Sequence, residues 1–122
     1  MERTGPMSAT EGAVDRDLAL ANVGGDQELL AEIVELFVVE SPRMLAAIDR
    51  AVASSDPTAL QLAAHTLKGS ASVFGAQRAV ELSFELESMG GAGELTGAEE
   101  IRALLRAEID HVISSLEALV AG

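Results

Sequence analysis

Apolar residues recur at helical spacing along most of this chain, and short polar or glycine-containing breaks separate the repeats. The clearest repeat is Leu29, Leu30, Ile33, Val34 and Phe37, which follows the i, i+1, i+4, i+5, i+8 pattern of a helix with one buried face. No segment shows the strict apolar and polar alternation of a half-buried strand. The pattern therefore predicts an all-α protein.

Capping and turn residues mark where the predicted helices begin and end. Gly24-Gly25 ends a first short helix, and Asp26 then caps the second. Ser41-Pro42 is expected to start the third helix, and Asp56-Pro57 the fourth, because proline is favoured at the first helical position. The helices predicted from these signals span residues 15–23, 26–40, 42–53, 57–74 and 76–89, with a last long helix after residue 96.

Two further breaks complete the prediction. The run from Gly90 to Gly93 is predicted to be a loop, and Thr96-Gly97-Ala98-Glu99 is predicted to be the capping box of the last helix. Helices with apolar stripes and short connections form up-and-down bundles. The expected fold is an up-and-down four-helix bundle with one or two short accessory N-terminal helices.

Length and composition fit one small domain. The chain has 122 residues, of which 48% are hydrophobic, enough for a modest core. Residues 1–13 lack a helical repeat and are predicted to be a disordered linker or an expression remnant, so the bundle domain is assigned to residues 14–122. No cysteine, signal peptide or apolar run of membrane-spanning length occurs. We therefore expect a cytoplasmic protein without membrane insertion.

Charge narrows the range of partners. The net charge of −12 argues against nucleic-acid binding, which needs a basic surface. Between Arg43 and Arg78, however, four basic residues outnumber two acidic ones, Asp49 and Asp56. A locally cationic region in an acidic chain is suited to an anionic group and to an acidic partner.

The helix around His65 carries the candidate chemistry. At about 100° per residue, its core stripe should contain Leu60, Ala63, Leu67, Ala71 and Phe74, with the imidazole on the opposite, polar side. Gly69, one turn beyond His65, leaves the ring uncovered, and Lys68 at i+3 can pair with an anion held there. Neutral imidazole is a nucleophile near physiological pH, so the arrangement points to phosphate chemistry.

The run His65-Thr66-Leu67-Lys68-Gly69-Ser70, followed by Phe74-Gly75-Ala76, resembles the histidine-containing phosphotransfer (HPt) domains of multistep bacterial phosphorelays. The resemblance extends upstream to Gly24-Gly25-Asp26 and downstream to Leu86-Glu87, and covers roughly residues 15 to 121. It implies that His65 accepts a phosphoryl group from a receiver-domain aspartyl phosphate and passes it to another receiver aspartate. The implied partners are response-regulator receiver domains, with Mg²⁺ held by the receiver and no cofactor in this chain.

The resemblance also implies roles for the residues near His65. Lys68 would neutralise the phosphoryl group, Gly69 would leave space for it, and Glu87 would hydrogen-bond the other ring nitrogen. Met89-Gly90-Gly91 stands where many relatives carry a second basic residue, so Arg78 is the remaining candidate to assist Lys68. The residues expected at the receiver-docking surface are Gln61, Leu62, Ala64 and Ser72.

Alternatives remain open at this point. The same box occurs in the phosphoacceptor domain of chemotaxis-type histidine kinases, and a helical adaptor could keep the fold without transferring phosphate. No nucleotide-binding motif is present, so we expect a phosphohistidine carrier that does not phosphorylate itself from ATP. It is either a free protein or the C-terminal module of a hybrid kinase. Glu108-x-x-His111 has the spacing of half a di-iron site, but its second half is missing, so no metal is expected.

Overall fold

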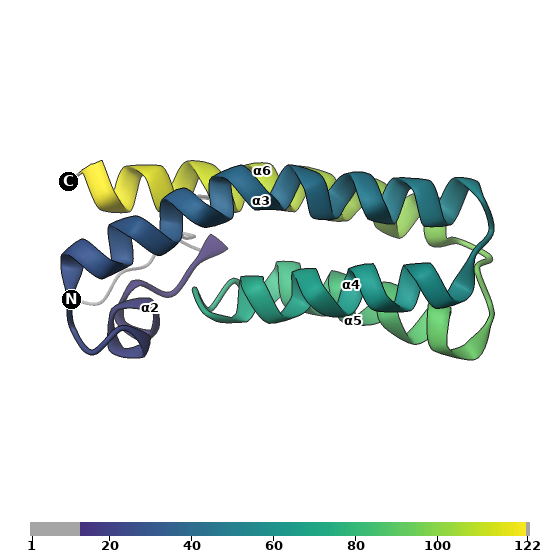
Figure 1. The fold of residues 1–122 in the computed structure, drawn as a ribbon, viewed down its shortest axis with the longest axis horizontal. Coiled ribbons are helices and arrows are strands. Elements are labelled where there is room, and N and C mark those ends of the chain that lie inside the picture. Colours follow the sequence, from purple (N-terminus) through teal and green to yellow (C-terminus); the bar gives the residue numbers. More distant parts are fainter. Residues whose placement is uncertain (1–12, 122) are drawn as a thin grey trace, which may run out of the picture.

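The computed structural model describes residues 13–121, and this part of the chain consists of helices without any strand. The predicted all-α fold is confirmed, and residues 16–121 form one accessory N-terminal helix and four bundle helices (Figure 1). The accessory helix is α2, and the bundle comprises α3 to α6. Their bounds are α2 Arg16–Asn22, α3 Gln27–Ala53, α4 Pro57–Ser72, α5 Gln77–Ala92 and α6 Ala98–Ala121.

The bundle is built from one long and one short pair of helices. Helices α3 and α6, of 27 and 24 residues, run side by side, and the 16-residue helices α4 and α5 pack below them in Figure 1. The longer pair therefore extends past the turn between α4 and α5. Helix α2 lies near that end, where the Asp15 amide donates to the Phe74 carbonyl at 2.9 Å and the Asn22 side chain to the Val73 carbonyl at 2.8 Å.

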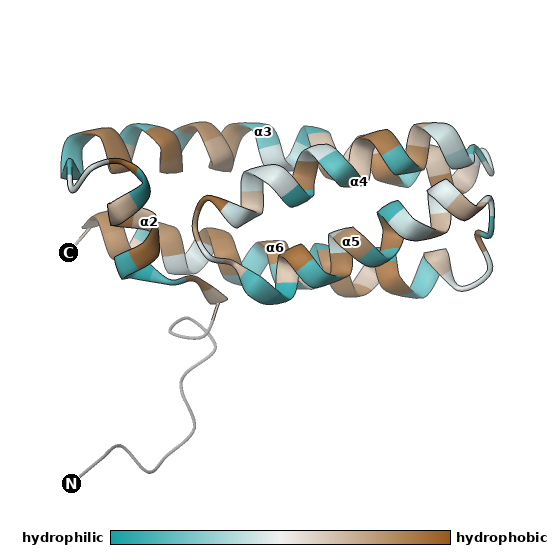
Figure 2. Cartoon of the chain, turned by 90° about the horizontal axis from the view of Figure 1, so that it is seen from below, coloured by the Kyte–Doolittle hydropathy of each residue, from teal (hydrophilic) through white to brown (hydrophobic). Residues whose placement is uncertain are grey.

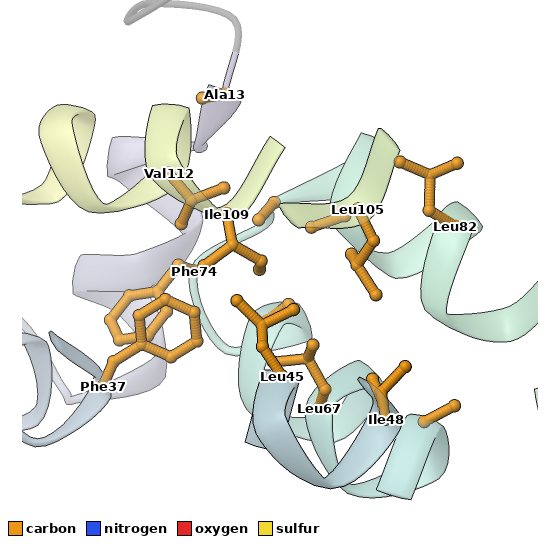
Figure 3. Packing of buried hydrophobic residues seen from close by; sticks show 14 of the residues in the cluster. Ala13, Phe37, Leu45, Ile48, Leu67, Phe74, Leu82, Leu105, Ile109 and Val112 are labelled. Carbon is orange, nitrogen blue, oxygen red and sulfur yellow. The ribbon is translucent and has the colours of Figure 1, made fainter. Parts of the chain in front are cut away.

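The core consists of aliphatic side chains with one aromatic pair. Phe37 of α3 meets Phe74, just after α4, edge to face with ring centroids 5.3 Å apart (Figure 3). Leu45, Leu67 and Ile109 continue the buried layer along the bundle axis. Figure 2 shows the resulting pattern, in which hydrophobic and hydrophilic residues alternate with the helical turns.

Aspartate side chains cap three of the helices. Asp15, Asp26 and Asp56 each accept a hydrogen bond from the backbone amide three residues later, at 3.0, 3.0 and 3.1 Å. The starts predicted at Asp26 and Asp56 are thus confirmed, and the cap at Asp56 fixes the beginning of the helix that carries His65.

The predicted break at Ser41-Pro42 is wrong, because α3 runs through it without interruption. A proline inside a helix loses one backbone hydrogen bond and costs about 3 kcal/mol. Here Pro42 is exposed, whereas Ser41 and Leu45 on either side of it are buried. Packing of both halves of α3 on the same core outweighs the local cost, so two predicted helices form one.

The loop predicted from Gly90 to Gly93 is also wrong, since α5 continues to Ala92 and ends at Gly93, whose φ is +72°. Gly90 is buried where α5 crosses α4, and a Cβ there would lie 2.6 Å from both the Gln61 nitrogen and the Pro57 oxygen. The glycine therefore permits close contact between the two helices.

The start of the last helix differs from the prediction as well. Gly97 has a φ of +87°, so it is not part of the helix, and α6 begins at Ala98. The capping box predicted around Thr96 required Gly97 to be helical and is therefore wrong. The Gly97 carbonyl instead accepts the hydrogen bond of the Ile101 amide at 3.3 Å.

At the N-terminus, Ala13 is 2% exposed and belongs to the core, although it was assigned to the linker. Residues 1–12 lie outside the described part of the chain, so the linker stays a prediction. Across residues 13–121, no helix combines the length and hydrophobicity needed to cross a membrane.

Substitution of Gly90 tests the close contact between α4 and α5. Gly90→Ala should lower the free energy of unfolding by about 1 to 3 kcal/mol, because the added methyl group meets backbone atoms that cannot move independently. Gly69→Ala is the matched control, since a Cβ at that helical position has no atom within 4 Å. Chemical denaturation measures both, and equal stability of the two variants would contradict the packing described.

Candidate functional site

His65 projects from α4 toward solvent while one of its ring nitrogens is held by α5. Its side chain is 64% exposed, and Nδ1 lies 2.9 Å from Oε2 of Glu87. In the neutral ring, a proton on Nδ1 donates to this carboxylate, which leaves Nε2 unprotonated. The imidazole is thus oriented by a contact between two helices.

The same carboxylate holds Lys68. The Lys68 Nζ lies 2.7 Å from Oε1 of Glu87, so the two oxygens of one side chain bind the imidazole and the ammonium separately. Glu87 is 17% exposed and Lys68 26% exposed, so this ion pair is better shielded from water than an ordinary surface pair. The structure therefore brings together His65, Lys68 and Glu87.

An aromatic side chain completes this cluster. The Lys68 Nζ lies 5.2 Å from the centroid of the Phe84 ring, within the range of a cation–π interaction. Phe84 precedes Glu87 by one turn of α5 and is 56% exposed. Phe84 was not among the residues predicted for the site, because its contact with Lys68 depends on how α4 and α5 pack.

The electrostatics of the cluster favour an ionised Glu87. The Lys68 ammonium, 2.7 Å from Oε1, is the largest influence and holds the pKa of Glu87 below its ordinary value of 4.5. Burial acts in the opposite direction, and the hydrogen bond with His65 lowers the pKa further. The carboxylate therefore keeps its negative charge beside the imidazole at neutral pH.

The surface around His65 is open on the side of Gly69. A Cβ at Gly69 would have no atom within 4 Å, and Ser72 donates through its hydroxyl to the Gly69 carbonyl at 2.7 Å. Three of the four predicted docking residues, Gln61, Leu62 and Ser72, are exposed. Leu62, a large apolar side chain one turn before His65 on α4, is 68% exposed.

Ala64, the fourth predicted docking residue, is fully buried, so its placement on the docking surface is wrong. With His65 at zero, the buried residues Leu60, Ala64, Leu67 and Ala71 lie at about 200° to 260°, whereas the predicted stripe was centred at 180°. Helix α4 packs against α5 as well as α3, and this rotates its buried face toward Ala64 and leaves Ala63 partly buried.

Arg78 does not join the cluster. It precedes Glu87 by nine residues of α5, which places it about 13 Å away along the helix axis and on the opposite face. Among residues 13–121, Lys68 is the basic residue in contact with the His65–Glu87 pair.

The candidate metal ligand His111 lies elsewhere, on α6. Its Nδ1 is 3.7 Å from Oε1 of Glu108, one turn earlier on the same helix. In the part of the chain that the structure describes, no group of three or more His, Cys, Asp or Glu side chains could hold a metal ion.

Comparison with known proteins agrees with this fold. Residues 32–115 match the family model of the Hpt domain, and the chain therefore belongs to that family. The chain is thus a histidine phosphotransfer module. No match was found among curated proteins.

A solved structure shares the whole fold. The crystal structure of histidine-containing phosphotransfer protein B (HptB) from Pseudomonas aeruginosa PAO1 superposes with a TM-score of 0.83 and 23% sequence identity. The match covers 89% of this chain and 95% of that chain.

Protonation of Glu87 should be visible in the acid stability of the domain. Because its pKa is lowered on folding, Glu87 stabilises the folded state above about pH 4.5, and this contribution is lost as pH falls through the lower folded pKa. As pH falls below about 4.5, wild-type protein should therefore lose more stability than Glu87→Gln. Glu85→Gln, which removes an exposed carboxylate from the same helix, is the control. Parallel pH profiles for wild type and Glu87→Gln would refute the ion-pair assignment.

Proposed function

We propose that this chain is a phosphorelay intermediate in which His65 accepts a phosphoryl group from the aspartyl phosphate of one receiver domain and delivers it to the aspartate of another. The observation that carries this proposal is the contact of His65 Nδ1 with Glu87 at 2.9 Å. It fixes an exposed imidazole with Nε2 directed away from the carboxylate. A nucleophile that is both oriented and accessible is what a carrier of this kind requires.

The bond changes follow from the orientation of the ring. The Nε2 lone pair attacks phosphorus, the N–P bond forms, and the P–O bond to the receiver aspartate breaks with its electron pair leaving on the carboxylate. The imidazole gains positive charge, and its Nδ1 proton remains hydrogen-bonded to Glu87. The carboxylate stabilises this cationic ring, and the reverse sequence delivers the group to a second aspartate.

Lys68 and Gly69 act on the phosphoryl group itself. Phosphoryl transfer depends mainly on positioning and on neutralisation of charge on the phosphoryl oxygens. Lys68 supplies an ammonium group one turn from His65, and the open space above Gly69 admits the phosphoryl group and the receiver that carries it. Mg²⁺ would be contributed by the receiver.

Docking of a receiver would use the exposed apolar side chains that flank the imidazole. Leu62 precedes His65 by one turn of α4 and Phe84 precedes Glu87 by one turn of α5, and both side chains are exposed, as are the polar residues Gln61 and Ser72 of α4. An exposed apolar pair around a polar centre suits a transient protein contact. Because receivers act inside the cell, we place the module in the cytoplasm.

The direct test is incubation with candidate receivers that carry labelled aspartyl phosphate, followed by detection of acid-labile, base-stable label on this chain. His65→Gln should abolish the label, whereas His111→Gln should leave it unchanged because His111 lies on α6, outside the cluster. Label that persists in His65→Gln would contradict the proposal. Label obtained from an ATP-bound kinase domain but from no receiver would assign the chain to the chemotaxis-type class instead.

Gly69 offers a second test, because stability and transfer should change in opposite directions. Gly69→Ala should raise the free energy of unfolding by about 0.5 to 1 kcal/mol, since alanine loses less backbone entropy in a helix and meets no atom there. The same methyl group should slow transfer, and a larger side chain should slow it more. Thermal unfolding and transfer kinetics of one preparation measure both effects. Transfer at the wild-type rate in a stabilised Gly69→Ala protein would show that the open space has no role in access.

A further inference from the structure

We infer that Phe84 is a positioning residue, which retains the Lys68 ammonium beside Glu87 in the resting domain and so limits its movement to the phosphoryl group. This inference rests on the proposed function of His65 and adds a residue that is absent from the family's histidine box. It follows from the contacts of Lys68 and from the side of the imidazole on which they lie.

Lys68 is held on the Nδ1 side of His65. Its Nζ contacts Oε1 of Glu87 at 2.7 Å, and the other oxygen of that carboxylate contacts Nδ1 of His65. The phosphoryl group, by contrast, forms at Nε2. To neutralise it, Lys68 has to leave the carboxylate to which it is bound in this structure.

Phe84 adds to the free-energy cost of this movement of Lys68. The ring faces the same ammonium at 5.2 Å, so Lys68 lies between a carboxylate and an aromatic ring and is only 26% exposed. A lysine side chain has several rotatable bonds and would otherwise sample many positions in water. The two contacts select one of them.

The position of Lys68 also affects the imidazole, through the charge of Glu87. While Lys68 neutralises part of the Glu87 charge, the carboxylate stabilises a cationic ring less than it would alone. Movement of Lys68 to the phosphoryl oxygens places positive charge on the incoming group and restores the full negative charge opposite Nδ1. When Lys68 moves from Glu87 to the phosphoryl group, it therefore stabilises phosphorylated His65 in two ways. It neutralises the phosphoryl oxygens on the Nε2 side, and it leaves the full carboxylate charge beside Nδ1.

A small phosphate donor separates this effect from receiver docking, in which Phe84 would also take part. Phosphoramidate phosphorylates histidine directly: the Nε2–P bond forms, and the donor P–N bond breaks with its electron pair leaving on ammonia. A cation–π contact at a partly exposed site corresponds to about a two- to fivefold change in an equilibrium constant. Phe84→Leu should therefore be labelled about two- to fivefold faster than wild type, as followed by ³¹P NMR.

Further variants distinguish the effect of the aromatic ring of Phe84 from the effect of its size. Phe84→Trp keeps the cation–π contact and should be labelled no faster than wild type. Leu104→Ala removes a comparably exposed apolar side chain from α6, away from the cluster, and should also match wild type. In a Lys68→Ala background, Phe84→Leu should have no effect, because the ring acts through the ammonium.

The resting contact has its own readout, which does not depend on phosphotransfer. In unphosphorylated protein, the ring current of Phe84 should shift the Lys68 ε-methylene protons, and Phe84→Leu should remove this shift while Phe84→Trp retains a shift. Absence of label on His65 in every variant would overturn the proposed function. Slower or unchanged labelling of Phe84→Leu, an undiminished Phe84→Leu effect in the Lys68→Ala background, or no ring-current shift on Lys68 would overturn the present inference alone.

Discussion

The Glu87 carboxylate is the contact on which the rest of the site depends, because it joins two helices through both of its oxygens. One oxygen orients His65 and the other holds Lys68, so the positions of the imidazole and the ammonium are set by a single side chain from the opposite helix. Removing Lys68 would leave the shielded Glu87 carboxylate without its counter-charge. The site is therefore a property of the α4–α5 pair.

This dependence explains why the packing between α4 and α5 is so close. Gly90 lets backbone atoms of the two helices approach at a level near Gln61, one turn from His65, and the cap at Asp56 fixes where α4 begins. Even a methyl group at Gly90 would push the two helices apart, and a hydrogen bond between them, such as that of His65 with Glu87, weakens when its atoms separate. The longer helices α3 and α6 pack against α4 and α5, respectively, and contribute no side chain to the cluster of His65, Lys68, Glu87 and Phe84.

The sequence was sufficient to predict the all-α fold, the exposure of His65 and the grouping of Lys68 with it, since all three follow from the helical period. It was not sufficient where tertiary packing overrides local signals. Pro42 lies within α3 because both halves of that helix face one core, and Gly90 serves helix contact rather than a loop. The rotation of α4 that buries Ala64 and the contact of Phe84 with Lys68 depend on how two helices meet, which no single-helix pattern contains.

In the function proposed here, Glu87 determines which ring nitrogen of His65 carries the phosphoryl group. Heteronuclear ¹H–¹⁵N correlation of the histidine ring, recorded on ¹⁵N-labelled protein before and after phosphorylation, distinguishes the two nitrogens through their different couplings to the ring protons. We expect phosphorus to be bonded to Nε2 of His65 and Nδ1 to remain protonated toward Glu87. Phosphorylation at Nδ1, or an Nδ1 signal that is unchanged in Glu87→Gln, would contradict this expectation.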